Sequence, residues 1–269
     1  MRSPRRATSA RGRTAGVALL LAGAAPCAAI AGVTEGDKTA PASAYQEGLA
    51  AVAAGDDAAA LTRFEAALAA APDDLKAADQ YRKAVIRSGE YDRSVAFFER
   101  LTTDHPQAAY AWLNFGYAYV DKIPAAGSIT QVILASKALT QFTRSIEIER
   151  SWIALYTRGN SYLYWPKIFG RAPLGVADLE EAVALARRDP APKKVFVRSW
   201  VALGDGYWKT DQPERAKATW EEGSRRFPGD PQLGTRLARD GDELERYLYD
   251  QLDPNQRVDT DLTPLWEEK

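Results

Sequence analysis

Residues 197–230, VRSWVALGDGYWKTDQPERAKATWEEGSRRFPGD, contain the pattern that decides the fold. Large rings and small residues recur there at helical intervals, and a proline stands near the end of the stretch. The positions are Trp200, Leu203, Gly204, Tyr207, Ala216, Trp220, Gly223 and Pro228. Small residues let two helices approach closely, large rings fill the space beside the contact, and proline suits the exit turn. The stretch therefore predicts two short helices packed against each other.

The same pattern recurs upstream with a period of about 34 residues. The first unit carries Gly48, Ala60, Phe64, Ala67 and Pro72, and the second carries Tyr81, Tyr91, Phe98, Leu101 and Pro106. The third unit has Trp112, Phe115, Gly116, Tyr119, Ala138, Phe142 and Ser145, and the fourth has Leu155, Gly159, Tyr162, Gly175, Leu179 and Ala182. In the third and fourth units the second helix comes late, because residues 121–134 and 163–174 are inserted between the two helices. The sequence therefore predicts five units in all, at about 41–74, 75–108, 109–151, 152–196 and 197–230.

On these residues the chain resembles the tetratricopeptide repeat superfamily, and the resemblance covers about residues 41–230. It implies an all-α, right-handed superhelical solenoid in which each helix pair buries its apolar face against its neighbours. After Pro231, leucines at helical spacing predict a capping helix over 231–252 that is interrupted at Gly241. The superfamily is associated with binding of proteins or peptides, and the resemblance implies no particular enzymatic activity.

Residues 1–31 have the three-part layout of a secretory signal: an arginine-rich start, the apolar run TAGVALLLAGAAP and the small-residue stretch CAAIAG. We expect cleavage after Ala31, so that the mature chain begins at Gly32, contains no transmembrane span and resides in the periplasm. Residues 32–40 are expected to be a flexible linker. The apolar run is shorter than the roughly 18 residues of a membrane span, which makes a permanent anchor the weaker alternative.

Two other export routes stay open. Cys27 could carry a lipid and anchor the protein in the envelope, although Pro26 stands where a lipoprotein signal has a small residue. Arg5 and Arg6 allow twin-arginine export, but the polar residues that follow them favour general secretion.

The charge of the mature chain argues against nucleic-acid binding. The full chain has 35 Lys and Arg and 36 Asp and Glu, and residues 1–31 contain five Arg and no acid. The mature chain is therefore acidic, with a net charge near −6, and lacks the basic surface that phosphate binding requires. Cys27 is the single cysteine, so packing must stabilise the mature chain without a disulfide.

The sequence offers little for catalysis. The single histidine, His105, stands in a turn between two units, and no spacing typical of zinc, haem, calcium or phosphate sites is present. Paired acids such as Glu180 and Glu181, or Glu221 and Glu222, point in different directions on a helix, and we interpret them as solvated faces. We therefore expect no catalytic residue, metal site or cofactor.

The resemblance implies a binding surface on the inner wall of the solenoid, which this repeat superfamily forms mainly from the first helix of each unit. Its candidate residues are Tyr110, Asn114, Tyr117, Tyr156, Asn160, Arg198, Asp205 and Trp208. Tyrosine and tryptophan offer large contact areas at low entropic cost, and both are common anchors for protein partners. A second candidate is the aromatic and basic insertion, with Tyr164, Trp165, Lys167, Phe169 and Arg171. An aromatic and basic loop suits recognition of an anionic partner, but its rings could equally fill a gap that the insertion creates.

These features predict a non-catalytic adaptor or scaffold that binds a protein or peptide in the cell envelope. The resemblance to exported members of the tetratricopeptide repeat superfamily implies a role in assembly or maturation of an envelope complex. The alternative is a small-ligand or glycan-binding accessory of an envelope enzyme that uses the insertion 163–174. An enzyme built on paired carboxylates is the weakest interpretation. The extended tail, 253–269, contains Leu262, Leu265 and Trp266 and either folds back into the groove or binds a partner.

Overall fold

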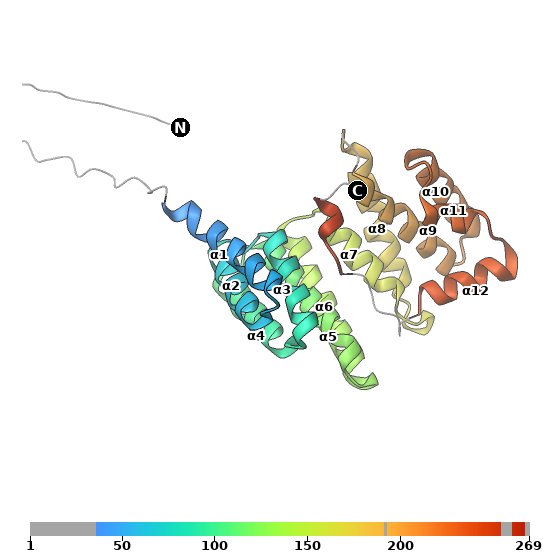
Figure 1. Cartoon of the computed structure of the whole chain (residues 1–269). Helices are drawn as coiled ribbons and strands as arrows, with labels where there is room; N and C mark the ends of the chain where they lie inside the picture. The colour runs from blue at the N-terminus through green and yellow to red at the C-terminus, as the bar shows by residue number, and fades with distance from the viewer. Residues whose placement is uncertain (1–35, 191–192, 254–259, 267–269) are drawn as a thin grey trace, which may run out of the picture. The chain divides into compact units, whose positions relative to one another are not determined.

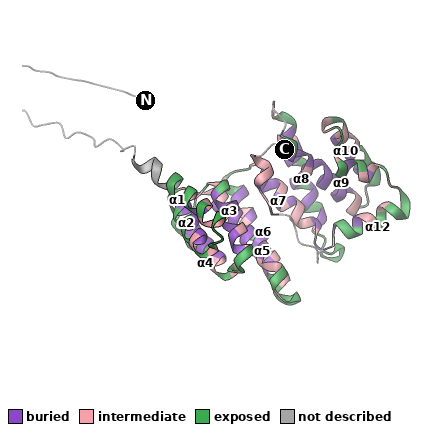
Figure 2. Cartoon of the chain, in the orientation of Figure 1, coloured by how far each residue is buried: buried purple, intermediate pink, exposed green. Residues whose placement is uncertain are grey.

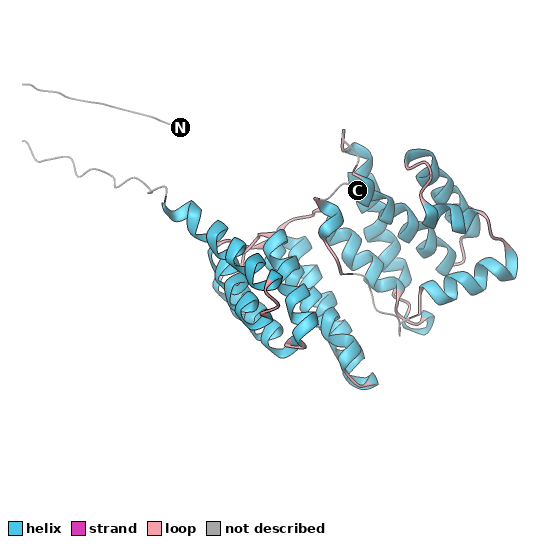
Figure 3. Ribbon diagram, in the orientation of Figure 1, coloured by secondary structure: helices cyan, strands magenta, loops and turns pink. Residues whose placement is uncertain are grey.

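The structure is a computed structural model that describes residues 36–190, 193–253 and 260–266, and its helices follow one another in antiparallel pairs (Figures 1 and 3). The first three pairs are α1 (Gly36–Ala53) with α2 (Asp57–Ala70), α3 (Leu75–Ser88) with α4 (Tyr91–Asp104), and α5 (Ala109–Lys122) with α6 (Ser128–Ile148). Two further pairs are α7 (Trp152–Leu163) with α8 (Ala172–Arg188) and α9 (Val197–Lys209) with α10 (Pro213–Arg226), followed by α11 (Pro231–Leu237) and α12 (Gly241–Gln251). Those described ranges contain no strand, and the all-α prediction is confirmed.

Local sequence signals explain where several helices begin and end. Asp74 accepts hydrogen bonds from the backbone N–H groups of the first turn of α3, and Asp56, Ser151 and Asp230 cap α2, α7 and α11 in the same way. Gly89 ends α3 with a φ of 76°, a left-handed conformation that glycine adopts without strain.

Glycine and a large side chain meet where the two helices of a pair touch. A Cβ added at Gly116 would lie 2.3 Å from the ring of Phe142, and one at Gly48 would lie 2.5 Å from Phe64. These rings belong to a continuous core, and Figure 2 shows buried residues along helices such as α8 and α9. The small and large residues of the sequence pattern thus act as packing partners, as predicted.

Three segments differ from the expectation or refine it. Residues 36–40, expected in a flexible linker, lie in α1, since the apolar and small residues that follow allow the helix to begin earlier. The insertion 121–134 forms a short 3₁₀ turn, Ile123–Ala125, and then lengthens α6 at its start, where Ile129, Val132 and Ile133 are exposed. The single predicted cap is two helices, because Gly241 has a φ of 45° and begins a new helix.

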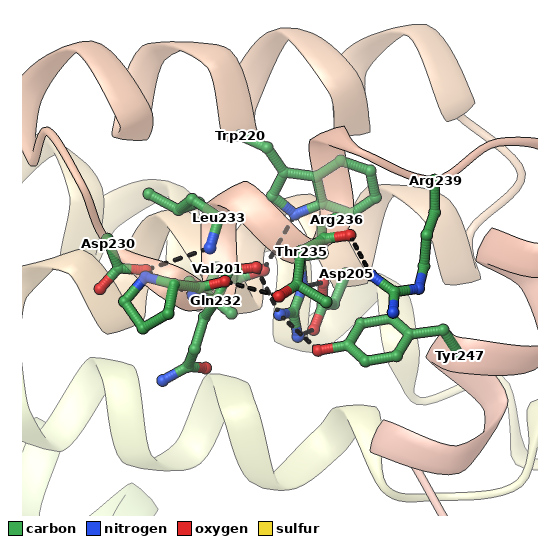
Figure 4. A network of polar contacts seen from close by, with 11 residues as sticks. Val201, Asp205, Trp220, Asp230, Gln232, Leu233, Thr235, Arg236, Arg239 and Tyr247 are labelled. Atoms are coloured by element: carbon green, nitrogen blue, oxygen red, sulfur yellow. Dashed lines mark hydrogen bonds and ion pairs between the residues drawn. The ribbon is translucent and has the colours of Figure 1, made fainter.

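The cap is joined to the last repeat by a buried ion pair. Arg236 of α11 donates from Nε and Nη2 to the two carboxylate oxygens of Asp205 in α9, each over 2.6 Å. Arg236 also donates to the backbone oxygen of Gln232, and its guanidinium lies beside Tyr247 of α12 (Figure 4). Burial disfavours the charge, but Asp205 more than compensates and raises the pKa of Arg236.

Candidate partner-binding groove

The residues predicted to line the groove divide into two sets. The half-buried set is Tyr110, Tyr156, Asn160, Arg198 and Trp208, and the buried set is Asn114, Tyr117 and Asp205. The prediction that the buried three face a partner needs correction, because their polar atoms are used within the chain. Asp205 binds Arg236, the Tyr117 hydroxyl lies 2.5 Å from Thr157 Oγ1, and the Asn114 amide bridges Tyr110 and a buried arginine.

That arginine, Arg82 of α3, is the centre of the site. It is 1% exposed, donates from Nε to Asp121 Oδ2 over 3.0 Å and from Nη1 to Asn114 Oδ1 over 3.2 Å, and lies 4.4 Å from the Tyr117 ring centroid. Asp121 and Asn114 both belong to α5, so the arginine joins the first helices of two adjacent units. We call Asp79, Arg82, Lys83, Asn114 and Asp121 the Arg82 clamp.

The chain's own C-terminal segment, 260–266, occupies the Arg82 clamp. Arg82 Nη2 donates to the backbone oxygen of Thr260 over 2.5 Å, and the Thr260 hydroxyl donates to Asp121 Oδ1 over 2.6 Å. The backbone N–H of Leu262 donates to Asp79 Oδ1 over 3.0 Å. Two buried side chains of α3 therefore bind a main-chain acceptor and a main-chain donor two residues apart, and the tail folds back into the groove, one of the two alternatives.

A second layer of contacts holds the polar side chains of the tail. Lys83 Nζ lies 2.8 Å from Asp79 Oδ2 and 2.6 Å from Asp261 Oδ1, and it donates to Thr263 Oγ1. Burial would lower the pKa of Lys83, but its hydrogen bonds to Asp261 and Asp79 outweigh burial and raise it. The tail thus enters the groove with one carboxylate that faces one half-buried ammonium group.

Acid should loosen the docked tail. Desolvation favours the neutral form of Asp261, but hydrogen bonds from Lys83 and Thr263 outweigh it and lower the pKa of Asp261 to about 2, from an ordinary value of 3.8. Because the pKa is lower in the docked state, this carboxylate stabilises docking fully above about pH 4 and loses that effect as the pH falls towards 2. We expect the NMR signal of the docked Leu262 amide to weaken over this range. In Asp261→Asn the same signal should change little, and an identical pH profile in both proteins would contradict the assignment.

The sequence contained a signal for this clamp that the pattern of large rings and small residues did not reveal. Gly48, Gly116, Gly159 and Gly204 are the eighth residues of their units, and Arg82 is the eighth residue of the second unit. An arginine at a position that other units use for close helix packing indicates a polar contact particular to this unit. Asp121 falls in the predicted insertion 121–134 and not among the predicted groove residues, and its role follows only from the fold.

The insertion 163–174 mostly fills space within its own unit. Trp165 is buried, makes an edge contact with Phe169 and has the Arg171 guanidinium 3.9 Å from its ring centroid. Lys167 forms an exposed ion pair with Asp211. Trp165 is therefore a packing residue, which agrees with the gap-filling alternative, while Phe169 and Lys167 remain at the surface.

A cleft of about 840 Å³ lies where this insertion meets α9 and α12. Tyr164 and Lys167 of the insertion line it together with Trp208 and Tyr249, whose rings make an edge contact with centroids 5.5 Å apart. One predicted groove residue, Trp208, thus lines the same cleft as the insertion and not the Arg82 clamp.

The described residues supply no metal-ligand cluster of three or more His, Cys, Asp or Glu side chains. His105 is exposed at the end of α4, and Glu181 and Glu222 bind Arg150 and Arg187 of neighbouring units, which lowers the pKa of both carboxyls. Within the same ranges, every helix is too short or too polar to cross a bilayer. The predicted signal 1–31, with Cys27, lies outside the described residues.

The comparisons identify the fold. No protein-family model matches the sequence, and no curated protein matches it either. The structure is similar to the thermophilic TPR protein TTC0263 of Thermus thermophilus, with a TM-score of 0.52 and 22% identity over 74% of this chain and 97% of that chain. Looser similarity extends to MamA, with a TM-score of 0.47 and 15% identity over 70% of this chain and 92% of that one. A tetratricopeptide repeat protein of Parabacteroides merdae gives a TM-score of 0.39 and 13% identity, over 80% and 92%.

The helix pairs and the similarity to TTC0263 define the class: the chain has the fold of the tetratricopeptide repeat superfamily. The predicted resemblance and fold class are confirmed. The fold alone implies no particular activity, which depends on the side chains of the chain's own groove.

Proposed function

We propose that the chain is a non-catalytic adaptor of the cell envelope that binds a protein partner by holding a short segment of it in the Arg82 clamp. This proposal depends on the hydrogen bonds of Arg82 and Asp79 to the main chain of Thr260 and Leu262. Within the tail predicted to be extended, residues 263–265 form a 3₁₀ turn, and the two main-chain hydrogen bonds are made just before it. A groove that binds main-chain groups in this way has the chemistry needed to bind a peptide.

The half-buried aromatic residues support the same proposal. Tyr156 stacks on Trp152 with parallel rings 5.2 Å apart, and Tyr110 donates to Glu149 from its hydroxyl. Rings that are fixed by such contacts lose little conformational freedom when a partner covers them, which favours affinity.

Site-specific photocrosslinking in envelope extract tests the adaptor proposal. A photoreactive residue in place of Lys76, which is exposed on α3 beside Trp266, should capture one defined protein through one defined segment. The matched control places the same residue at Glu99, which is exposed on α4. The captured segment, once purified, should bind the purified full chain and lose affinity for Lys83→Gln. Equal capture from both positions, or cross-links within the chain alone, would contradict the proposal.

The envelope location is proposed from residues 1–31 and has its own test. Mass spectrometry of the protein from its native cell should find a mature N-terminus at Gly32 in the periplasmic fraction. A lipid-modified Cys27 in the membrane fraction would replace this with an anchored form. Recovery of an intact arginine-rich N-terminus from the cytoplasm would overturn the proposed location.

A further inference from the structure

We infer that residues 260–266 are a built-in competitor for the Arg82 clamp, and that the partner presents a short segment of the same chemistry: a hydroxyl residue, an aspartate and a large aliphatic residue in sequence. This inference rests on the proposed function and specifies the partner and the regulation of the same site.

The tail matches the Arg82 clamp one side chain at a time. The Thr260 hydroxyl donates to Asp121, the Asp261 carboxylate faces Lys83, and Leu262 is only 3% exposed. Main-chain hydrogen bonds accept most sequences, whereas these three contacts select a small donor, an anion and an apolar side chain. They define the segment that the Arg82 clamp recognises.

The charged side chains of the Arg82 clamp keep their ion-pair partners when the tail leaves. Arg82 keeps its ion pair with Asp121 and its hydrogen bond with Asn114, and Lys83 keeps its ion pair with Asp79. Losing the tail removes main-chain groups and one carboxylate that is 43% exposed. No buried charge of the clamp is left alone, so undocking lacks the large penalty of breaking a buried ion pair.

The tail is tethered to the Arg82 clamp because both belong to the same chain. A segment joined to its groove by a short connection has an effective concentration on the order of millimolar. If the open clamp binds such a segment with a dissociation constant of about 0.1 mM, the tethered tail weakens binding of a free segment about tenfold. Release of the tail would therefore act as a switch between a closed and an open groove.

The test measures binding of a fluorescein-labelled peptide with the sequence of residues 258–266, VDTDLTPLW, to the full-length chain. The variant Leu262→Asp places a carboxylate at a buried position and should undock the tail, so that the peptide binds about tenfold more tightly than to the unchanged chain. The control Leu174→Asp makes the same substitution at a leucine that is 55% exposed on α8 and should leave peptide affinity unchanged. A peptide that itself carries Asp in place of Leu262 should bind neither protein.

A second variant and a second measurement guard against a folding defect. Asp261→Lys, at a partly exposed position, places a second cation against Lys83 and should undock the tail. Peptide affinity should therefore rise, as it does in Leu262→Asp. In the unchanged chain, the Leu262 amide should exchange with solvent much faster than the amides of Phe98 or Trp200, because only the tail must move. Exchange at the rate of those core amides, or equal peptide affinity in all variants, would show that the tail is a fixed part of the fold and would overturn the inference. The crosslinking result from Lys76 would still decide the adaptor proposal independently.

Discussion

Arg236→Met should reduce the free energy of unfolding by about 3–5 kcal/mol, the range expected when one partner of a buried ion pair is removed. Asp205 is 4% exposed and its two oxygens bind Arg236, so the variant leaves a carboxylate in the core without a counter-ion (Figure 4). Methionine preserves most of the volume of the side chain, which limits the loss from packing. Urea unfolding followed by circular dichroism measures the difference.

A double-mutant cycle separates the charge from the packing. In Asp205→Leu with Arg236→Met the unpaired carboxylate is absent, and stability should recover most of what Arg236→Met lost. The exposed pair of Arg187 and Glu222 is the matched control, since both side chains are at least one-third accessible to solvent. There Arg187→Met should cost no more than about 1 kcal/mol. Equal losses at the two sites, or no recovery in the double variant, would contradict the assignment of a buried pair.

The role of Asp205 depends on a contact that the sequence pattern does not encode. Its place on the first helix of the last unit predicts a groove residue, and the same frame correctly predicts the helices and their packing partners. The cap changes its role, because Arg236 comes from α11 and reaches across to it. Helical periodicity says that leucines of the cap face the core, but it gives no information on which polar residue of the cap meets which polar residue of the repeat.

In the Arg82 clamp, too, helical spacing predicts some residues of the site but not the contacts between distant segments. Positions 79 and 83 fall on the groove face by helical spacing alone, and both contact the tail. The contact between Arg82 and Thr260 joins residues 178 apart in sequence, and no local pattern encodes it. Short-range periodicity thus predicts the framework of a solenoid, whereas a segment that returns to the groove is determined by long-range complementarity of charge and hydrogen bonding.

Substitution of Gly204, which lies in close contact with Trp220, should also cause a large loss of stability. A Cβ at this position would lie 2.1 Å from Nε1 of Trp220, a distance that no real contact reaches, and Trp220 is 2% exposed with its ring enclosed in the core. Gly204→Ala should therefore lower the free energy of unfolding by about 1–3 kcal/mol, because either the ring or the helix must move. Alanine also favours the helix by about 1 kcal/mol relative to glycine, so the net loss measures a larger steric cost.

Gly234→Ala is the control that isolates the steric contribution. Gly234 lies within α11, is exposed, and has no atom within 4 Å of an added Cβ. The same substitution there gains the helical preference without a clash, and thermal unfolding should show stabilisation by about 0.5–1 kcal/mol. Opposite signs for one substitution at two helical glycines would show that Gly204 is required by the approach of α9 to α10 and not by backbone freedom. If both variants were stabilised, Trp220 would have to pack elsewhere, and the ring-on-glycine contact could not be what sets the spacing of the helix pair.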